Sequence, residues 1–177
     1  RSPCSHEEAD TRLFLHIICA VQNNYRRFMI RTADTDVVVI AVAAFNKIKP
    51  DAMWIAIGTG SSFRYIAVHE VVATMDPRSS NTLPVHHAFT GCDTVSAFAG
   101  RGKKTAWDTW KMFPEVTKSF EELLPREVSE PSMLLLERFV VLMYNRTSDI
   151  VEMNEARKQL LLRNQGLWRT SLEHELL

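Results

Sequence analysis

The sequence predicts an α/β fold, a three-layer arrangement around a mainly parallel sheet, with a helical extension at the C-terminal end. Helix-like and strand-like segments alternate through the first half of the 177 residues, and beyond residue 105 the apolar pattern is helical throughout. With 46% apolar residues, the chain can also build a sizeable core. We therefore expect a core domain over 1–113 and a helical extension over 114–177 that packs on the same domain.

The first elements are a helix, a strand and a second helix. Ser5 and Glu8 form a capping box, and apolar residues then recur on one face, which predicts an amphipathic helix over 6–22. The apolar run 26–33 predicts a buried strand. The alanine-rich run 37–48 is too long for a strand and predicts a helix.

The middle of the chain carries two short strands and a loop. Segments 52–58 and 63–68 are rich in β-forming residues and are joined by Thr-Gly-Ser-Ser, which predicts a hairpin or a pair of sheet strands. Residues 69–75 predict a short helix. The polar segment 76–82 predicts a loop, after which Pro84 begins a helix that ends at about Phe89.

The second half predicts helices separated by prolines and by a Thr-Ser-Asp turn. Leucine, valine and aromatic residues recur at helical spacing, and proline interrupts the pattern because it cannot continue a helix. The tail 163–177 has weak periodicity and receives no assignment. The predicted helical segments are 105–113, 115–124, 131–146 and 151–162.

Charge and cysteine usage limit the classes of function. The 21 basic residues balance 21 acidic residues, so any anion must be bound by a local cluster rather than by the field of the whole protein. Three widely spaced cysteines favour a reducing, intracellular location, which includes the nucleus. No apolar run approaches the about 20 residues of a membrane span, so we expect no membrane partner.

Acidic residues gather at the ends of three predicted elements. Mg²⁺ and Mn²⁺ take oxygen ligands, and phosphoryl chemistry uses two such ions held by shared carboxylates. Carboxylates from separate elements are needed to build such a site, whereas a zinc site would need cysteines and histidines at spacings that are absent from the sequence. The acidic residues concerned are Glu7, Glu8, Asp10, Asp34, Asp36 and Asp93.

Four motifs resemble the PIN-like, flap-endonuclease type of 5′ nuclease, in order and in approximate spacing. They are "EADT" at 8–11, "TADTD" at 32–36, "TGCD" at 90–93 and "GRGKKTA" at 100–106, and the likeness runs from about residue 5 to residue 110. The resemblance implies a PIN-like, Rossmannoid sheet and a Mg²⁺- or Mn²⁺-dependent hydrolase. It also implies catalytic roles for Asp34, Asp36 and Asp93, and metal ligation by Glu8, Asp10, Asp34, Asp36 and Asp93.

The last motif is similar to the family's glycine-rich helix-hairpin-helix turn, which holds a nucleic-acid phosphate through backbone N–H groups. This resemblance implies nucleic acid as the partner, with DNA preferred over RNA. The residues implied are Gly100, Arg101, Gly102, Lys103, Lys104 and Thr105. The sequence also resembles, over most of its length, uncharacterised nuclease-like open reading frames present in many copies in some animal genomes, a likeness that names no activity.

The chain also departs from the family pattern. The family places its first metal-binding aspartate on a strand before the first helix, so we expect this chain to be part of a longer polypeptide and its metal site to be incomplete. Arg101 stands where the turn usually carries an apolar residue. No arch that would thread a flap is visible, so structure-specific cutting is not predicted.

Each acidic motif has a structural alternative. Acidic residues in a first turn stabilise a helix, and capping by Glu8 competes with metal ligation. One aspartate is enough to cap the helix after the strand, whereas Asp34 and Asp36 together repel each other unless a cation lies between them. Asp93 alone could cap a helix after Gly91.

The other polar and aromatic candidates also have plain alternatives. Lys103 and Lys104 could simply solvate a loop, although the Gly-x-Gly frame favours phosphate binding. The adjacent His86 and His87 have no partner acid at triad spacing and receive no chemical role. Tryptophans at apolar-periodic positions are predicted to fill the core rather than to stack on bases; they are Trp54, Trp107 and Trp110.

Two functions follow as hypotheses. The first is divalent-metal-dependent hydrolysis of nucleic-acid phosphodiester bonds. The second is a catalytically inactive, nuclease-derived module that binds nucleic acid or protein, which the balanced charge and the large helical half favour. A Rossmann-type cofactor enzyme would need a glycine fingerprint directly after the first strand, where residues 31–36 carry Arg-Thr-Ala-Asp-Thr-Asp instead.

Overall fold

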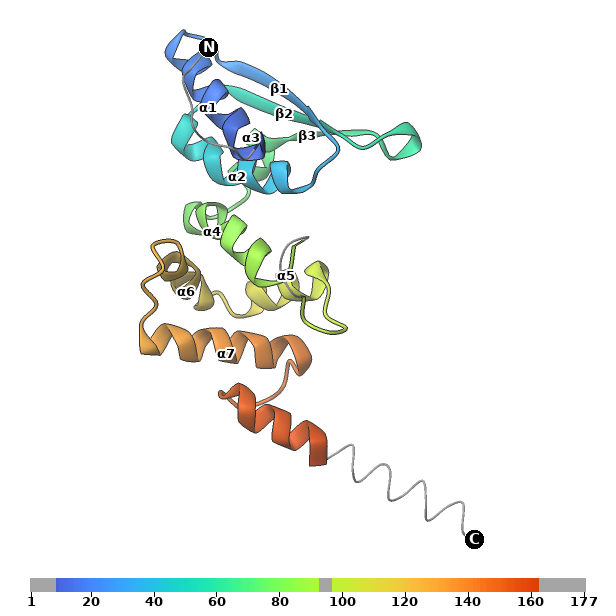
Figure 1. Cartoon of the computed structure of the whole chain (residues 1–177), viewed down its shortest axis with the longest axis vertical. Helices are drawn as coiled ribbons and strands as arrows, with labels where there is room; N and C mark the ends of the chain where they lie inside the picture. Colours follow the sequence, from blue (N-terminus) through green and yellow to red (C-terminus); the bar gives the residue numbers. More distant parts are fainter. Residues whose placement is uncertain (1–8, 93–96, 163–177) are drawn as a thin grey trace. The chain divides into compact units, whose positions relative to one another are not determined.

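The computed structural model of the chain describes residues 9–92 and 97–162 (Figure 1). The chain divides into two compact units, Arg1–Phe89 and Thr90–Leu177. The first is an α/β unit, and helices are the regular elements in the described residues of the second, so the chain is a mixed α/β protein with a helical C-terminal part. The division between the units comes earlier in the chain than residue 113, where the sequence suggested the end of the core.

The first unit is built on a three-stranded sheet with the order β1-β2-β3. Strand β1 (Arg27–Thr32) pairs in parallel with β2 (Ala52–Ile57), and β2 pairs antiparallel with β3 (Arg64–Ala67). In the described part of the chain the sheet is therefore mixed rather than mainly parallel. The reason is the short link between β2 and β3, because a parallel crossover needs about a dozen residues or more.

The link between β2 and β3 depends on a glycine. Gly58 adopts a φ of +88°, and a Cβ added there would lie 2.6 Å from the carbonyl oxygen of Ser62. The short 3₁₀ helix η1 (Gly60–Ser62) follows and is closed by Ser62, whose Oγ donates to the Thr59 carbonyl at 2.7 Å. The hairpin predicted for 52–58 and 63–68 is confirmed.

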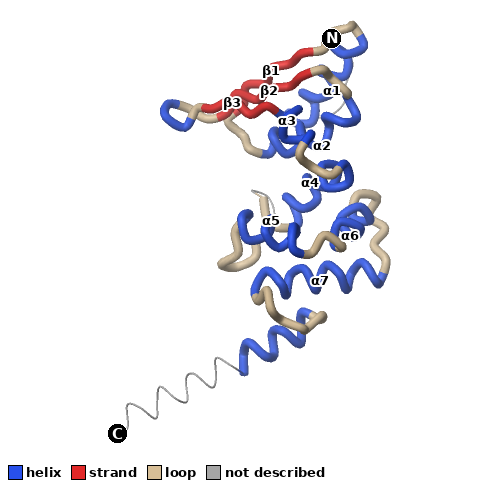
Figure 2. Tube along the Cα trace, turned by 180° about the vertical axis from the view of Figure 1, so that it is seen from behind, coloured by secondary structure: helices blue, strands red, loops and turns tan. Residues whose placement is uncertain are grey.

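Helices α1 (Ala9–Gln22), α2 (Asp36–Ile48) and α3 (Val68–Ala73) cover one face of the sheet, as Figures 1 and 2 show. Side chains that alternate along the strands meet apolar side chains of these helices and form the core of the unit. The predicted strand 26–33 and helix 37–48 are thereby confirmed. The core includes Phe14, Ile17, Ile30, Val37, Ala41, Val42, Met53, Ile55, Ile57 and Val68.

The prediction of a loop over 76–82 was wrong, because helix α4 spans Pro77–Phe89. Asp76 caps this helix: its Oδ2 accepts from the amide of Ser79 at 3.1 Å. Pro77 then occupies the first helical position, where its missing N–H costs nothing. Pro84 lies inside the helix rather than in its first turn.

The second unit contains four helices in its described residues, α5 (Lys103–Met112), α6 (Val116–Leu123), α7 (Glu130–Tyr144) and the stretch 153–162. All four were predicted from the apolar spacing. A row of aromatic rings joins α5, α6 and α7: Trp110 meets Phe120 with centroids 5.4 Å apart, and Phe120 meets Phe139 at 5.6 Å, both edge to face. Such aromatic pairs add stability beyond their buried area.

Polar contacts set the boundaries of the helices in this unit. Ser129 caps α7 by accepting from the amide of Ser132, and it donates through Oγ and N to Glu122 of α6 at 2.7 and 2.9 Å. Glu137 of α7 accepts from the amide of Met153, which fixes the start of the last described helix. None of the helices in residues 9–92 and 97–162 is both long and apolar enough to cross a bilayer.

Candidate functional site

Asp34 and Asp36 lie at the carboxyl end of β1, where the strand turns into α2. The amide of Asp34 donates to Thr32 Oγ1 at 3.0 Å, and Asp34 Oδ1 accepts from the amide of Asp36 at 2.8 Å. These two contacts form a tight turn that fixes both carboxylates at one corner of the sheet. Asp36 is also the first residue of α2, where the helix dipole favours a negative charge.

His87 joins this corner from α4. Its Nε2 lies 2.9 Å from Asp36 Oδ1, and the side chains of His87 and Asp36 are 20% and 38% exposed. A carboxylate accepts, so Nε2 is the atom that carries the proton in this contact. The sequence assigned His87 no chemistry, and no local spacing could have revealed the pair, because 51 residues separate its members.

The two carboxylates keep oxygens that a cation could use. Asp34 and Asp36 each employ Oδ1 in the contacts above, and within the described residues neither Oδ2 has a polar partner. Mg²⁺ is commonly held by one or two carboxylates together with water. The two Oδ2 atoms could therefore supply part of the ligand set of a divalent cation.

The other predicted metal ligands do not complete that site in the described chain. Asp10 lies in the first turn of α1, and residues 9–92 and 97–162 contain no group of three or more His, Cys, Asp or Glu side chains that could hold a metal ion. Glu8 and Asp93 lie outside the described residues. The five-carboxylate site stays a prediction.

The glycine-lysine turn leads into α5 in the second unit. Gly100 has a φ of +67°, the amide of Arg101 donates to the Phe98 carbonyl at 3.0 Å, and Gly102 is the N-cap of α5 without a side-chain cap. The turn therefore presents the N-terminal end of a ten-residue helix, and Thr105 lies within its first turn. Helix N-termini of this kind favour anions.

The side chain of Arg101 has a structural role. Its Nη2 donates to the Tyr144 carbonyl at the end of α7 at 3.2 Å, and its guanidinium carbon lies 5.1 Å from the centroid of the Tyr144 ring. Tyr144 Oη also donates to the Ala99 carbonyl at 3.2 Å. The cation of Arg101 thus ties the turn to α7.

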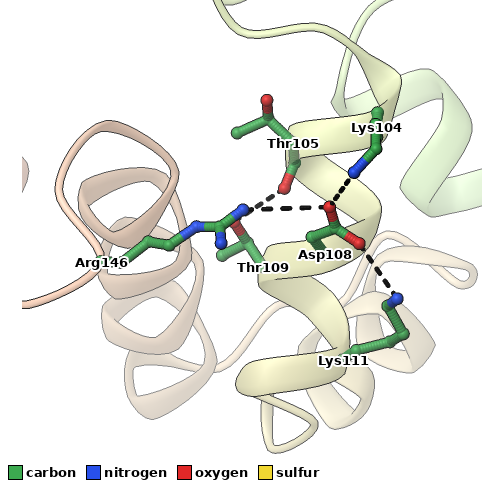
Figure 3. A network of polar contacts seen from close by, with 6 residues as sticks. All are labelled: Lys104, Thr105, Asp108, Thr109, Lys111 and Arg146. Atoms are coloured by element: carbon green, nitrogen blue, oxygen red, sulfur yellow. Dashed lines mark hydrogen bonds and ion pairs between the residues drawn. The ribbon is translucent and has the colours of Figure 1, made fainter.

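Both lysines of the turn also contact neighbours. Lys103 Nζ donates to Thr90 Oγ1 at 3.0 Å. Lys104 Nζ lies 2.7 Å from Asp108 Oδ2, while Lys111 Nζ lies 3.0 Å from Asp108 Oδ1 (Figure 3). Hydrogen bonds from Lys104 and then Lys111 lower the pKa of Asp108 to about 2.

Figure 3 also shows Arg146 approaching this carboxylate from the segment after α7, with Nη2 3.9 Å from Asp108 Oδ2. Three cations thus surround one aspartate. Lys104 is 91% exposed and could exchange Asp108 for an external anion at small cost, because surface ion pairs are weak. When Lys104 leaves Asp108, Lys111 and Arg146 still contact this carboxylate.

Gly91 in the predicted third motif has a structural reason to be glycine. Its φ is +96°, and an added Cβ would lie 2.7 Å from the Cβ of Ala97. The chain before and after residues 93–96 therefore comes close together at this point. Any larger residue at position 91 would force the backbone apart.

An apolar cavity of about 300 Å³ lies in the second unit between α7 and the helix 153–162. Its walls carry few polar groups, and none of them is acidic, so the cavity suits an apolar occupant rather than a reacting phosphate. The lining residues include Phe98, Val141, Tyr144, Ile150, Met153, Ala156 and Leu160.

Comparisons with protein-family models, with curated proteins and with solved structures find no match to this chain.

Proposed function

We propose that this chain is a nuclease-like domain that uses a divalent cation, Mg²⁺ or Mn²⁺, to hydrolyse phosphodiester bonds of nucleic acid. One observation carries the proposal: Asp34 and Asp36 are held together at the carboxyl end of β1, each with an unengaged Oδ2 in the described structure. Ligands of open α/β sheets collect at this end of the strands. The motif resemblance adds Glu8, Asp10 and Asp93 as further ligands, and a three-layer PIN-like arrangement as the complete fold.

The residues at the corner have separate tasks. Asp34 and Asp36 would hold the cation through Oδ2, and the cation, when bound, would neutralise phosphate charge and activate water. The turn from Thr32 to Asp36 holds the carboxylates in place before the cation arrives. His87 donates to Asp36 Oδ1, so it orients that carboxylate and acts as a positioning residue.

The second unit supplies a candidate element for binding the nucleic-acid backbone. The N-terminus of α5 offers backbone N–H groups and the positive end of the helix dipole. Lys103 and Lys104 add charge at the same end of the helix. Arg101 holds the turn against α7 through its contacts with Tyr144, and we do not propose that it contacts substrate.

The test combines cation binding with cleavage. Mn²⁺ binding is measured by calorimetry, and cleavage of labelled single-stranded and flapped DNA is followed with Mg²⁺ or Mn²⁺ present. Asp34→Asn keeps the Oδ1 acceptor of the turn but removes the charge, so we expect the fold to persist and cation binding to weaken at least tenfold, with cleavage lost.

Asp51→Asn is the matched control, because Asp51 is an exposed acid at the other end of the sheet, beside the start of β2. It should bind the cation and cleave like the wild type. Equal cation affinity in Asp34→Asn and the wild type would refute the proposed site.

A second candidate is a nuclease-derived module that binds without cutting. The side-chain contacts of the turn favour it: Arg101 and Lys104 already have intramolecular partners, and Asp36 is engaged by His87. This alternative predicts nucleic-acid binding that is insensitive to EDTA and no cleavage at any Mg²⁺ or Mn²⁺ concentration. The same two assays therefore separate the two functions.

A further inference from the structure

One face of the sheet in the first unit is left open by the described helices. Figures 1 and 2 show α1, α2 and α3 on the same side of β1, β2 and β3. Side chains that alternate with the core residues point to the other side. Of these, Met29 and Tyr65 are 66% and 60% exposed, and Trp54 is half-buried between them in the sheet.

The open face carries positive charge without acidic compensation. Arg27 and Arg31 alternate with the core residues of β1 and therefore lie on the open face, and the three strands contain no aspartate or glutamate. Within the described residues none of these arginines has an acidic partner. In a chain whose total charge is balanced, this is a local basic surface.

Aromatic rings stand among these arginines in a defined order. The register sets Arg31, Ala56 and Tyr65 side by side across the sheet. Because the side chain of Ala56 is small, the surface of the sheet is lower at the centre of this row than at Arg31 and Tyr65. Phe63 continues the surface beyond Tyr65: its ring contacts Tyr65 edge to face at 5.2 Å, and the Arg31 guanidinium lies 5.9 Å from its centroid.

In the next row of the sheet the aromatic residue lies on the central strand. Met29, Trp54 and Ala67 are neighbours in register. The indole of Trp54 is braced by the edge-to-face ring of His69 at 4.8 Å, and His69 Nδ1 lies 3.1 Å from the Met53 carbonyl oxygen. One edge of the Trp54 surface is therefore in contact with His69.

We propose that this open face, defined by Arg27, Met29, Arg31, Trp54, Phe63 and Tyr65, binds single-stranded nucleic acid. Unpaired bases stack on Tyr65 and Trp54, and the arginines of β1 neutralise the phosphates alongside. Sequence-tolerant binding of single strands depends on this combination of aromatic platforms and a positive surface. The inference deepens the proposed function and rests on it for the class of ligand, but it does not require the metal site.

The chemistry of the face favours a single strand over other occupants. A duplex hides its base faces and could use only the arginines. An apolar protein surface would bury Arg27 and Arg31 without a partner, which is costly. An unpaired strand satisfies both features, because each nucleotide offers one ring face and one negative charge.

The test measures binding in EDTA, so that cleavage plays no part. Fluorescence anisotropy follows a labelled oligothymidylate and a duplex of the same length, with the full chain and its variants. We expect tighter binding of the single strand. Tyr65→Ala should weaken it at least about fivefold, the lower end for losing one stacked base. Arg31→Ala should lower the salt dependence, a slope of log affinity against log salt, by about 0.7.

Matched controls lie outside the face. Tyr25→Ala removes a ring that is 66% exposed in the turn after α1, and Lys47→Ala removes an exposed charge in the last turn of α2. Both should bind like the wild type. Trp54→Phe retains an aromatic ring, and in this variant the quenching of tryptophan fluorescence by the oligonucleotide should be reduced. Circular dichroism verifies that each variant is folded.

Two results would overturn the inference. One is that Tyr65→Ala and Arg31→Ala bind the oligonucleotide as the wild type does. The other is that the chain binds no oligonucleotide but associates with itself through this face, seen as a concentration-dependent mass that Tyr65→Ala abolishes. The proposed function fails separately, when the wild type binds single strands in EDTA but does not cleave them with Mg²⁺ or Mn²⁺.

Discussion

Ionised side chains have different surroundings in the two units. In the second unit several of them contact each other or the backbone: Asp108 is surrounded by Lys104, Lys111 and Arg146, and Arg101 is held by Tyr144. In the first unit, the arginines of β1 have no acidic partner within the described residues. Charges paired inside a unit stabilise that unit, whereas unpaired charges arranged on one surface are available to a ligand.

The cores of the units differ as well. The first unit packs aliphatic side chains between a sheet and helices, so its core depends on strand register. The second packs edge-to-face rings between helices, from Trp110 through Phe120 to Phe139. The contrast assigns the second unit's stability to a few large side chains, whereas the first unit carries the candidate cation site and the open sheet face.

The largest effect expected from this contrast is that of Phe139→Ala. Phe139 is completely buried, and its removal leaves a cavity at the end of the aromatic row, so we expect a loss of about 3–5 kcal/mol in the free energy of unfolding. Urea unfolding followed by circular dichroism measures this. Leu134→Ala, at a position 45% exposed on the same helix, is the control and should change stability by less than about 0.5 kcal/mol. Similar losses of stability in both variants would contradict the claim that a few buried aromatic side chains stabilise the second unit.

A smaller effect is expected from Ser129→Ala. Ser129 caps α7 and donates to Glu122 of α6, so its hydroxyl links two helices. Loss of an N-cap hydroxyl costs about 0.5–2 kcal/mol. Ser148→Ala serves as a control in the same unit, since Ser148 Oγ accepts from the nearby amide of Ile150 and has no other side-chain hydrogen bond among the described residues. The same urea unfolding would contradict the linking role if Ser129→Ala lost no more stability than Ser148→Ala.

The smallest effect is the pH dependence of the second unit. Hydrogen bonds from the Ser129 side chain and then its backbone lower the pKa of Glu122 to about 2, and the pKa of Asp108 is lowered to the same value. A lowered folded-state pKa stabilises the fold above the unfolded value, near pH 4, and this contribution disappears as the pH falls towards 2.

Acid titration of helical circular dichroism at a fixed urea concentration checks this effect. We expect stability to fall between about pH 4 and pH 2, less steeply in Glu122→Gln and in Asp108→Asn than in the wild type. High salt should weaken the Asp108 part, because its ion pairs are at the surface. Equal slopes in the wild type and both variants would show that these two carboxyl groups do not set the acid limit.

Local patterns were sufficient for most elements. Apolar spacing predicted α1, α2 and the helices of the second unit, and β-rich runs around a glycine turn predicted β2 and β3. The exception was α4, whose mixed composition hides its helical character. Asp76 followed by Pro77 is typical of a helix N-terminus. The prediction gave more weight to the polar, loop-like composition of residues 76–82.

The site was less accessible to sequence reasoning. The position of Asp34 and Asp36 between a strand and a helix followed from local patterns. Local patterns could not predict three other features, because each depends on residues brought together by packing. They are the contact between Asp36 and His87, the contact between Arg101 and Tyr144, and the open aromatic face.

Apart from α4, the sequence by itself determined which segments form helices and strands and which of their faces are apolar, because both depend on interactions over a few residues. Only the tertiary structure decided which charges are paired and which side of the sheet stays uncovered. The physical reason is that pairing and burial depend on distances across the fold. A histidine 51 positions away from Asp36 can lie 2.9 Å from it, whereas Asp34, two positions away, contacts it through the backbone amide.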